Sequence, residues 1–98
     1  MIVKLNVNIN CPKLGWIKLL DTKYRVYVDE ELITERNWSW DYYTYIDENI
    51  WVDLDETNMH KIRVCSGGEY SIPYTVSDLR IDNKPKSGVE GPEIAFYL

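Results

Sequence analysis

The sequence predicts an all-β protein, an antiparallel β-sandwich of jelly-roll type with about seven or eight short strands. Three observations lead to this fold class. Apolar residues alternate with polar ones in most segments, turn residues recur at short intervals, and no stretch repeats apolar residues at helical spacing over three turns. A chain of 98 residues is expected to form one domain, 1–98.

The first strand is predicted over residues 1–10, where the alternation is most regular. Its apolar face is formed by Val3, Leu5, Val7 and Ile9. Its polar face is formed by Lys4, Asn6, Asn8 and Asn10. A half-buried antiparallel strand has this pattern. Residues 11–15 interrupt it, and a second strand is expected over 16–20.

Two hairpins are expected next. Residues 24–28 alternate, an acidic turn follows at 29–31, and the chain resumes over 32–40. Residues 50–54 alternate in the same way, and the polar run 55–58 is interpreted as a second hairpin turn into a strand over 60–64. Both predictions depend on the turn residues between the alternating segments.

The last third of the chain is expected to hold one more long strand and a tail. The segment 66–69 contains two glycines, which can take the positive φ that a hairpin turn needs, and a strand is predicted over 70–82. Residues 84–98 are rich in turn residues and end in an apolar run, 94–98. We expect this run to dock as an edge strand or to pack on a neighbouring chain.

Charge and hydropathy exclude several classes of function. Eleven basic residues stand against 16 acidic ones, the net charge is −5, and no Lys/Arg cluster occurs, so strong nucleic-acid binding is disfavoured. No apolar run approaches the roughly 20 residues of a membrane helix. The first residues lack the features of a signal peptide, so Cys11 and Cys65 are expected to be reduced, packed thiols in a reducing environment.

The sequence also argues against catalysis. His60 is the only histidine, and it lies in a predicted strand without an identifiable nucleophile, so it is interpreted as a surface or sheet-face residue. One histidine and two distant cysteines make no recognisable zinc ligand set. Acidic pairs for glycoside hydrolysis exist, but an active-site cleft usually needs a larger scaffold. We therefore expect no enzyme and no cofactor.

Calcium is the one metal that the acidic residues bring into question. Asp53 and Asp55 begin a segment that resembles an oxygen-ligand loop, but Asn58 stands where an EF-hand requires glycine and Val64 where it requires glutamate. A calcium site of another type stays open if other aspartates approach this segment in space. The candidates are Asp29, Asp41 and Asp78.

The aromatic residues are concentrated between positions 38 and 51. Trp38 and Trp40 share one face of a strand, and at least one of them is expected to close the core, with Arg36 stacked beside them. Trp51 is expected to point outward, because its neighbours define the inward face. With Tyr42, Tyr43 and Tyr45 it makes a candidate contact surface for a protein, or for a sugar that stacks on Trp38, Trp40 or Trp51.

Three phrases carry a resemblance to known proteins: "YRVYVDEELITERNW", "ENIWVDLDETNMHKIRV" and "YTVSDLRIDNKP". Over roughly residues 23–84 the chain resembles small carbohydrate-binding-module-like β-sandwich proteins, in particular short virion-associated proteins of tailed phages. The resemblance implies a non-enzymatic building block, attached to a capsid, tail or fibre by its aromatic face or its terminal strand.

The function expected from the sequence is thus that of a structural or adhesive module, a minor phage virion protein made in the host cytoplasm and acting by protein–protein contacts. Two alternatives stay open. One is a carbohydrate-binding module, with or without calcium. The other is a small acidic inhibitor of a host protein.

Overall fold

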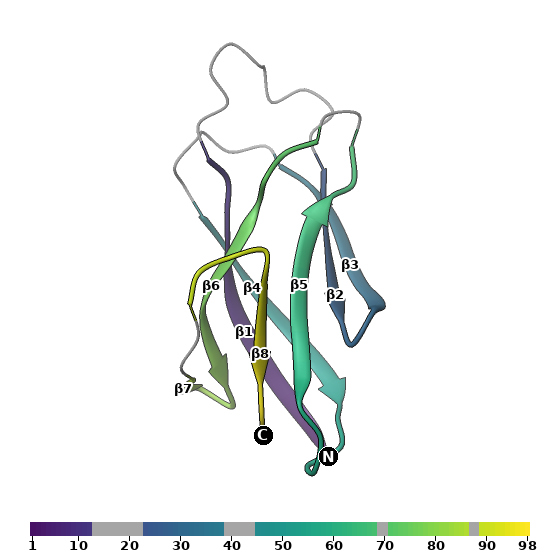
Figure 1. The fold of residues 1–98 in the computed structure, drawn as a ribbon, viewed down its shortest axis with the longest axis vertical. Helices are drawn as coiled ribbons and strands as arrows, with labels where there is room; N and C mark the ends of the chain where they lie inside the picture. Colours follow the sequence, from purple (N-terminus) through teal and green to yellow (C-terminus); the bar gives the residue numbers. More distant parts are fainter. Residues whose placement is uncertain (13–22, 39–44, 69–70, 87–88) are drawn as a thin grey trace.

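The computed structural model describes residues 1–12, 23–38, 45–68, 71–86 and 89–98, and the statements below concern these residues. Two four-stranded antiparallel sheets pack as a sandwich (Figure 1). Sheet A has the strand order β4-β1-β6-β7, and sheet B has the order β3-β2-β5-β8. The strands are β1 (Ile2–Asn10), β2 (Lys23–Val28), β3 (Glu31–Asn37), β4 (Tyr45–Asp53), β5 (His60–Ser66), β6 (Thr75–Ile81), β7 (Lys84–Pro85) and β8 (Glu93–Phe96).

The predicted fold class is confirmed, including the β-sandwich and its eight strands. The strand expected over 16–20 lies outside the described residues. The apolar run at the end of the chain forms β8, an edge strand of sheet B that pairs with β5, as expected.

Strand β1 lies in the middle of sheet A and pairs with β4 on one side and β6 on the other. Its alternation is preserved without a break: Val3, Leu5, Val7 and Ile9 are all buried, and the residues between them face outward. A β-bulge at Asp78, whose φ is 53°, shifts the register between β1 and β6.

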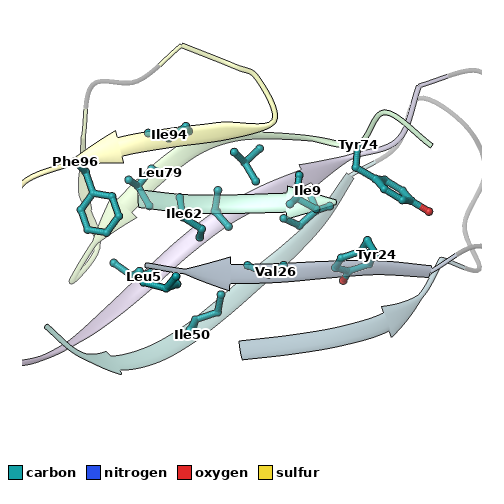
Figure 2. Close-up of a cluster of buried hydrophobic side chains, with 14 of the residues drawn as sticks. Leu5, Ile9, Tyr24, Val26, Ile50, Ile62, Tyr74, Leu79, Ile94 and Phe96 are labelled. Carbon is teal, nitrogen blue, oxygen red and sulfur yellow. The ribbon is translucent and has the colours of Figure 1, made fainter. Parts of the chain in front are cut away.

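The core lies between the two sheets (Figure 2). Sheet A contributes Leu5, Ile9 and Ile50, and sheet B contributes Val26 and Ile62. All five side chains are buried. Burying an aliphatic side chain of this size stabilises a protein by about 1.5–3 kcal/mol, so the alternation in the sequence is the main determinant of the fold.

The first predicted hairpin is confirmed. Strands β2 and β3 pair through a turn at Asp29 and Glu30, whose φ angles are 51° and 67°. Two successive left-handed residues give a turn whose twist matches that of the strands. Neither residue is glycine, so the turn retains some backbone strain.

The second predicted hairpin is wrong. Strand β4 belongs to sheet A and β5 to sheet B, so the connection between them crosses from one sheet to the other. Leu54 starts this connection and is buried in the core. Polar residues such as those of 55–58 occur in hairpin turns and in sheet-to-sheet connections alike, so local sequence could not separate the two.

The interpretation of 66–69 as a hairpin turn is also wrong, because β5 and β6 lie in different sheets. Gly67 does not have a positive φ, and its backbone instead passes close to Arg25: a Cβ at this position would lie 2.9 Å from Nε. The strand predicted over 70–82 is shorter than expected and begins at Thr75. Ile72 and Tyr74 precede it and are buried.

One side of the sandwich is closed by backbone hydrogen bonds. Val76 in sheet A donates to the carbonyl of Gly91 over 2.8 Å, and Val64 in sheet B donates to the carbonyl of Pro92 over 2.9 Å. Two adjacent peptide groups therefore join both sheets. On the opposite side, β3 and β4 are edge strands, and hollows lie between them.

Cys11 and Cys65 are both free, as expected. Cys11 is buried, and burial raises the pKa of its thiol to about 11. In the described part of the chain, no helix is long and apolar enough to cross a membrane.

Adjacent residues of β4 allow a direct test of the facing. Ile50→Ala should lower the free energy of unfolding by about 2–5 kcal/mol, because it leaves a cavity in the core. Trp51→Ala should lower it by about 1 kcal/mol or less, because that side chain is exposed. Urea unfolding of both variants measures the difference, and equal losses would show that Trp51 does not face outward.

Candidate binding surface

The outer face of sheet A has an unusual composition. In the register of β1 with β4, the outward neighbours are Lys4 and Trp51, Asn6 and Asn49, Asn8 and Asp47, and Asn10 and Tyr45. Four of these eight residues carry amide groups. We call this set of eight residues the amide face. It combines short polar groups at its centre with one aromatic ring towards each end of β4.

Hydrogen bonds fix the amide groups in place. The Nδ2 group of Asn6 donates to Asp47 Oδ1 at 2.6 Å and to Asn49 Oδ1 at 2.9 Å. Asn8 Nδ2 donates to Asp78 Oδ2 at 2.9 Å, and Asn10 Nδ2 donates to Ser77 Oγ at 2.9 Å. The carbonyl oxygens of the three asparagines take no part in these bonds. The face therefore presents acceptors whose positions are set by its own network.

The two aromatic residues of the amide face are exposed. Trp51 points outward as predicted, whereas Tyr45 was expected in the polar segment between strands and is the first residue of β4. Trp51 is 68% exposed and Tyr45 is 61% exposed. They are six residues apart on one strand, which places them roughly 20 Å apart. Both rings stand on the edge strand of a paired sheet, so their positions are set by backbone hydrogen bonds rather than by a loop.

The other aromatic candidates behave differently. Trp38 is 1% exposed and packs against the rings of Tyr24 and Tyr74, with centroids 6.0 and 5.8 Å away. It closes the core, as expected for at least one tryptophan of the pair, and offers no contact surface. Trp40, Tyr42 and Tyr43 lie outside the described residues.

The outer face of sheet B contrasts with the amide face because its charged groups pair with one another. Arg25 Nε contacts Glu35 Oε2 at 2.6 Å, and Arg63 contacts Glu30 Oε2 at 3.1 Å. The Arg63 guanidinium also lies 4.4 Å from the ring centroid of Tyr27. Because these charged groups interact with one another, the outer face of sheet B offers a ligand fewer unpaired polar groups than the amide face does.

A hollow of about 380 Å³ lies between β3 and β4, and Trp51 lines it. Its apolar lining comes from Val28, Ile33, Val52 and Leu54. Trp51 therefore stands where the amide face meets the open side of the sandwich.

A second hollow, of about 700 Å³, is lined by Arg36 and Glu48 and lies above a buried polar cluster. Glu48 is 3% exposed, and its Oε1 accepts hydrogen bonds from the Tyr24 hydroxyl and from Arg36 Nε, the latter at 2.6 Å. Burial and the nearby carboxylate raise the pKa of Tyr24, so its hydroxyl stays protonated and donates. This cluster joins β4 to β2 and β3 across the two sheets.

Arg36 was expected to stack beside the tryptophans; its Nε group forms an ion pair with the Glu48 carboxylate. Alternation along β3 correctly places it on the same side as Tyr24, with which it is paired in the register. Glu48 could not be singled out beforehand, because the acidic residues of the segment 47–56 all resemble solvated turn residues.

His60 lies on a sheet face, but on the inward one, so the expectation of a surface position is wrong. It is 5% exposed. Nδ1 lies 2.6 Å from Asp29 Oδ2, and Nε2 lies 2.5 Å from the carbonyl oxygen of Asp55. Both neighbours are acceptors, and a neutral imidazole can donate to only one of them. The hydrogen bond to Asp55 and the carboxylate of Asp29 raise the pKa of His60, against the opposing effect of burial.

The calcium candidates do not converge. Asp53 binds the amino group of Met1 at 2.8 Å, and Asp55 accepts bonds from the Thr57 amide and hydroxyl within its own turn. These bonds lower the pKa of Asp55. Asp29 is engaged by His60, and Asp41 lies outside the described residues. Among the described residues, no three His, Cys, Asp or Glu side chains form a group that could hold a metal ion.

The amide face was missed in the sequence, although its signal was present. The alternation of Asn6, Asn8 and Asn10 was recognised and interpreted only as the polar side of a strand. The sequence does not show which strand pairs with β1. Only the pairing of β1 with β4 brings these asparagines beside Asn49 and between the two exposed rings.

Comparisons of the chain with models of protein families, with curated protein sequences and with solved structures found no match.

The charge of His60 should make stability depend on pH. Its folded pKa is raised above the ordinary 6.5, so its contribution is fully present below pH 6.5 and is lost as the pH rises through the folded value. The difference in urea midpoint between wild type and His60→Gln should therefore shrink between pH 6 and pH 9. All other titrating groups are common to both proteins.

A difference that stays constant over this range would contradict the assignment. If His60→Gln does not fold, NMR titration of the single histidine of the wild type decides instead. A pKa at or below 6.5 would then refute the charged state.

Arg36 should be needed to hold the Glu48 carboxylate between the sheets. Arg36→Gln should lower the free energy of unfolding by about 1–3 kcal/mol, because a buried charge loses a charged donor. Arg36→Lys is the matched control, since it keeps the positive charge, and should lose less. Urea unfolding measures both, and equal stability of Arg36→Gln and wild type would show that the ion pair contributes nothing.

Proposed function

We propose that this chain is a non-enzymatic structural or adhesive module that holds a partner on the outer face of sheet A, and that it serves as a minor component of a phage virion. The observation that carries the proposal is Trp51. A large aromatic side chain that is 68% exposed on a paired strand adds little to the core and is available for contact.

Rigidity supports a role in contact. The ring of Trp51 and the amides beside it project from paired strands, and the amides are fixed by the hydrogen bonds of Asn6. A surface whose side chains are already ordered loses less conformational entropy when a partner binds. The virion assignment rests on the resemblance of residues 23–84 to short virion-associated proteins.

The test is to express a tagged copy of the chain in cells that produce the phage, and to measure whether it is incorporated into the particles. The wild-type chain should sediment with purified particles. If the face binds a virion protein, the chain with Trp51→Ala should be lost from particles. If the face binds the host, particles that carry Trp51→Ala should adsorb to host cells about 30-fold less well, because an aromatic hot-spot contact typically contributes about 2 kcal/mol.

The matched control is Tyr97→Ala, which removes another exposed ring, next to β8 of sheet B. Particles carrying it should keep their composition and their adsorption. The proposal fails if the wild-type chain is absent from particles. It also fails if Trp51→Ala particles equal the wild type in both measurements.

A further inference from the structure

We propose that the amide face binds a neutral polysaccharide, laid along β4 and β1 between Trp51 and Tyr45. This inference rests on the proposed function and names the partner class: a polysaccharide in place of the protein that the sequence led us to expect. Four features of the face support it, namely its rings, its amides, its charge and the polar character of its centre.

The rings suit sugars because a pyranose has a flat face of C–H groups that can stack on an aromatic side chain. Trp51 is the larger platform, and it lies beside Lys4 in the register. The ammonium group of Lys4 donates to Asn83 Oδ1 at 2.6 Å, in the turn between β6 and β7. This hydrogen bond directs the ammonium group toward the turn and away from the indole ring, which leaves the ring face open to a sugar.

The distance between the rings indicates a chain rather than a single sugar. Tyr45 and Trp51 stand roughly 20 Å apart along β4, far more than one sugar ring spans. A polymer that follows the strand would meet one ring towards each end and the polar groups in between. Asp47 and Asn49 occupy the outward positions of β4 between the rings.

The amides provide the hydrogen bonds that sugar hydroxyls need. A hydroxyl group both donates and accepts, and an amide side chain can do the same with its two ends. Asn6 uses its Nδ2 group to order Asp47 and Asn49, while its own Oδ1 takes no part in those bonds. The face thus carries acceptors and donors at fixed positions, which lowers the entropic cost of binding.

Charge favours a neutral polymer over an anionic one. Asp47 and Asp78 flank the row of asparagines, and the whole chain carries a net charge of −5. Arg80, paired with Asn6 in the register, and Lys4 are cations of this face, but two cations beside two carboxylates do not make the positive surface that a polyanion requires. Nucleic acids and acidic polysaccharides are therefore disfavoured.

The polar centre also favours a polysaccharide over a protein. Protein interfaces usually have an apolar core inside a polar rim. The amide face has the reverse arrangement, since its exposed rings stand towards the ends of β4 and the positions between them hold carboxylate and amide groups. Such a surface matches a ligand that is rich in hydroxyls along its whole length.

Native affinity gel electrophoresis tests the inference. The purified chain is run in gels that contain xylan, galactomannan, mixed-linkage β-glucan or dextran, in a gel with anionic alginate, and in a gel without polymer. At least one neutral polysaccharide should retard the wild type, and alginate should not. Trp51→Ala should weaken the apparent affinity about 30-fold.

Asn49→Ala tests the amides separately and should weaken the affinity about 5- to 10-fold, through the loss of one hydrogen-bonding group and of the ordering of Asn6. Tyr97→Ala, on sheet B, should bind as the wild type does. Unfolding midpoints confirm that each variant is folded. If Trp51→Ala does not fold, Tyr45→Ala replaces it and should weaken binding in the same direction.

The inference is overturned if no neutral polysaccharide retards the wild type, if alginate alone does, or if Trp51→Ala and Asn49→Ala bind as the wild type does. The particle experiment separates this failure from that of the proposed function. Loss of Trp51→Ala from particles, without retardation by any polysaccharide, would leave the module in place with a protein as its partner. No effect in either experiment would remove both proposals.

Discussion

The pairing of β1 on both of its edges is the constraint on which the rest of the structure depends. A strand that is hydrogen-bonded on both sides has no freedom to slip, because a shift by one residue would move Leu5 and Val7 to solvent and bring asparagines into the core. The same fixed register sets which residues of β4 face outward. The core and the amide face are thus two consequences of one alternation.

The two long sides of the sandwich differ in how their polar groups are used. On the closed side, the peptides of Gly91 and Pro92 join the sheets through backbone hydrogen bonds. On the open side, the sheets are joined by side chains, with Glu48 accepting from Tyr24 and Arg36. Side-chain contacts are easier to rearrange than a backbone ladder.

Near the β2–β3 turn, an imidazole links two segments of the chain. Hydrogen bonds with the backbone of Lys61 also hold Asp29 of the same turn. His60 connects Asp29 in that turn to the backbone at Asp55, in the connection that leaves sheet A. The left-handed residues Asp29 and Glu30 sit in the same turn. The imidazole of His60 helps to hold this strained turn against the sheet-to-sheet connection, so the strain of the turn and the contacts of His60 are expected to be coupled.

The sequence predicted the fold class and the buried face of individual strands, because the alternation of apolar and polar residues can be recognised within each strand by itself. The outward position of Trp51 and the first hairpin are examples. Its main errors concern which strands become neighbours. The β4–β5 and β5–β6 connections were taken for hairpins, since a polar turn does not state whether the next strand pairs with the last.

The candidate site was predictable only in part, for the same reason. Trp51 could be found from its own position in the alternation, whereas Tyr45 was expected in a polar segment between strands and is the first residue of β4. The asparagines of β1 could be recognised as part of a candidate site only once β4 was known to pair with β1. Glu48 could not be separated from the other carboxylates of its segment, because burial of a charge depends on partners that are distant in sequence.

The backbone join at Gly91 and Pro92 has a consequence for the order of folding. Strand β5 pairs on one edge with β2, which precedes it in the chain, and on the other with β8, which follows it only after β6 and β7. One edge of β5 therefore stays uncovered until β8 docks, and an uncovered strand edge favours misassociation. The same docking brings the carbonyls of Gly91 and Pro92 to Val76 and Val64, so covering the edge of β5 and joining the two sheets are expected to be a single event.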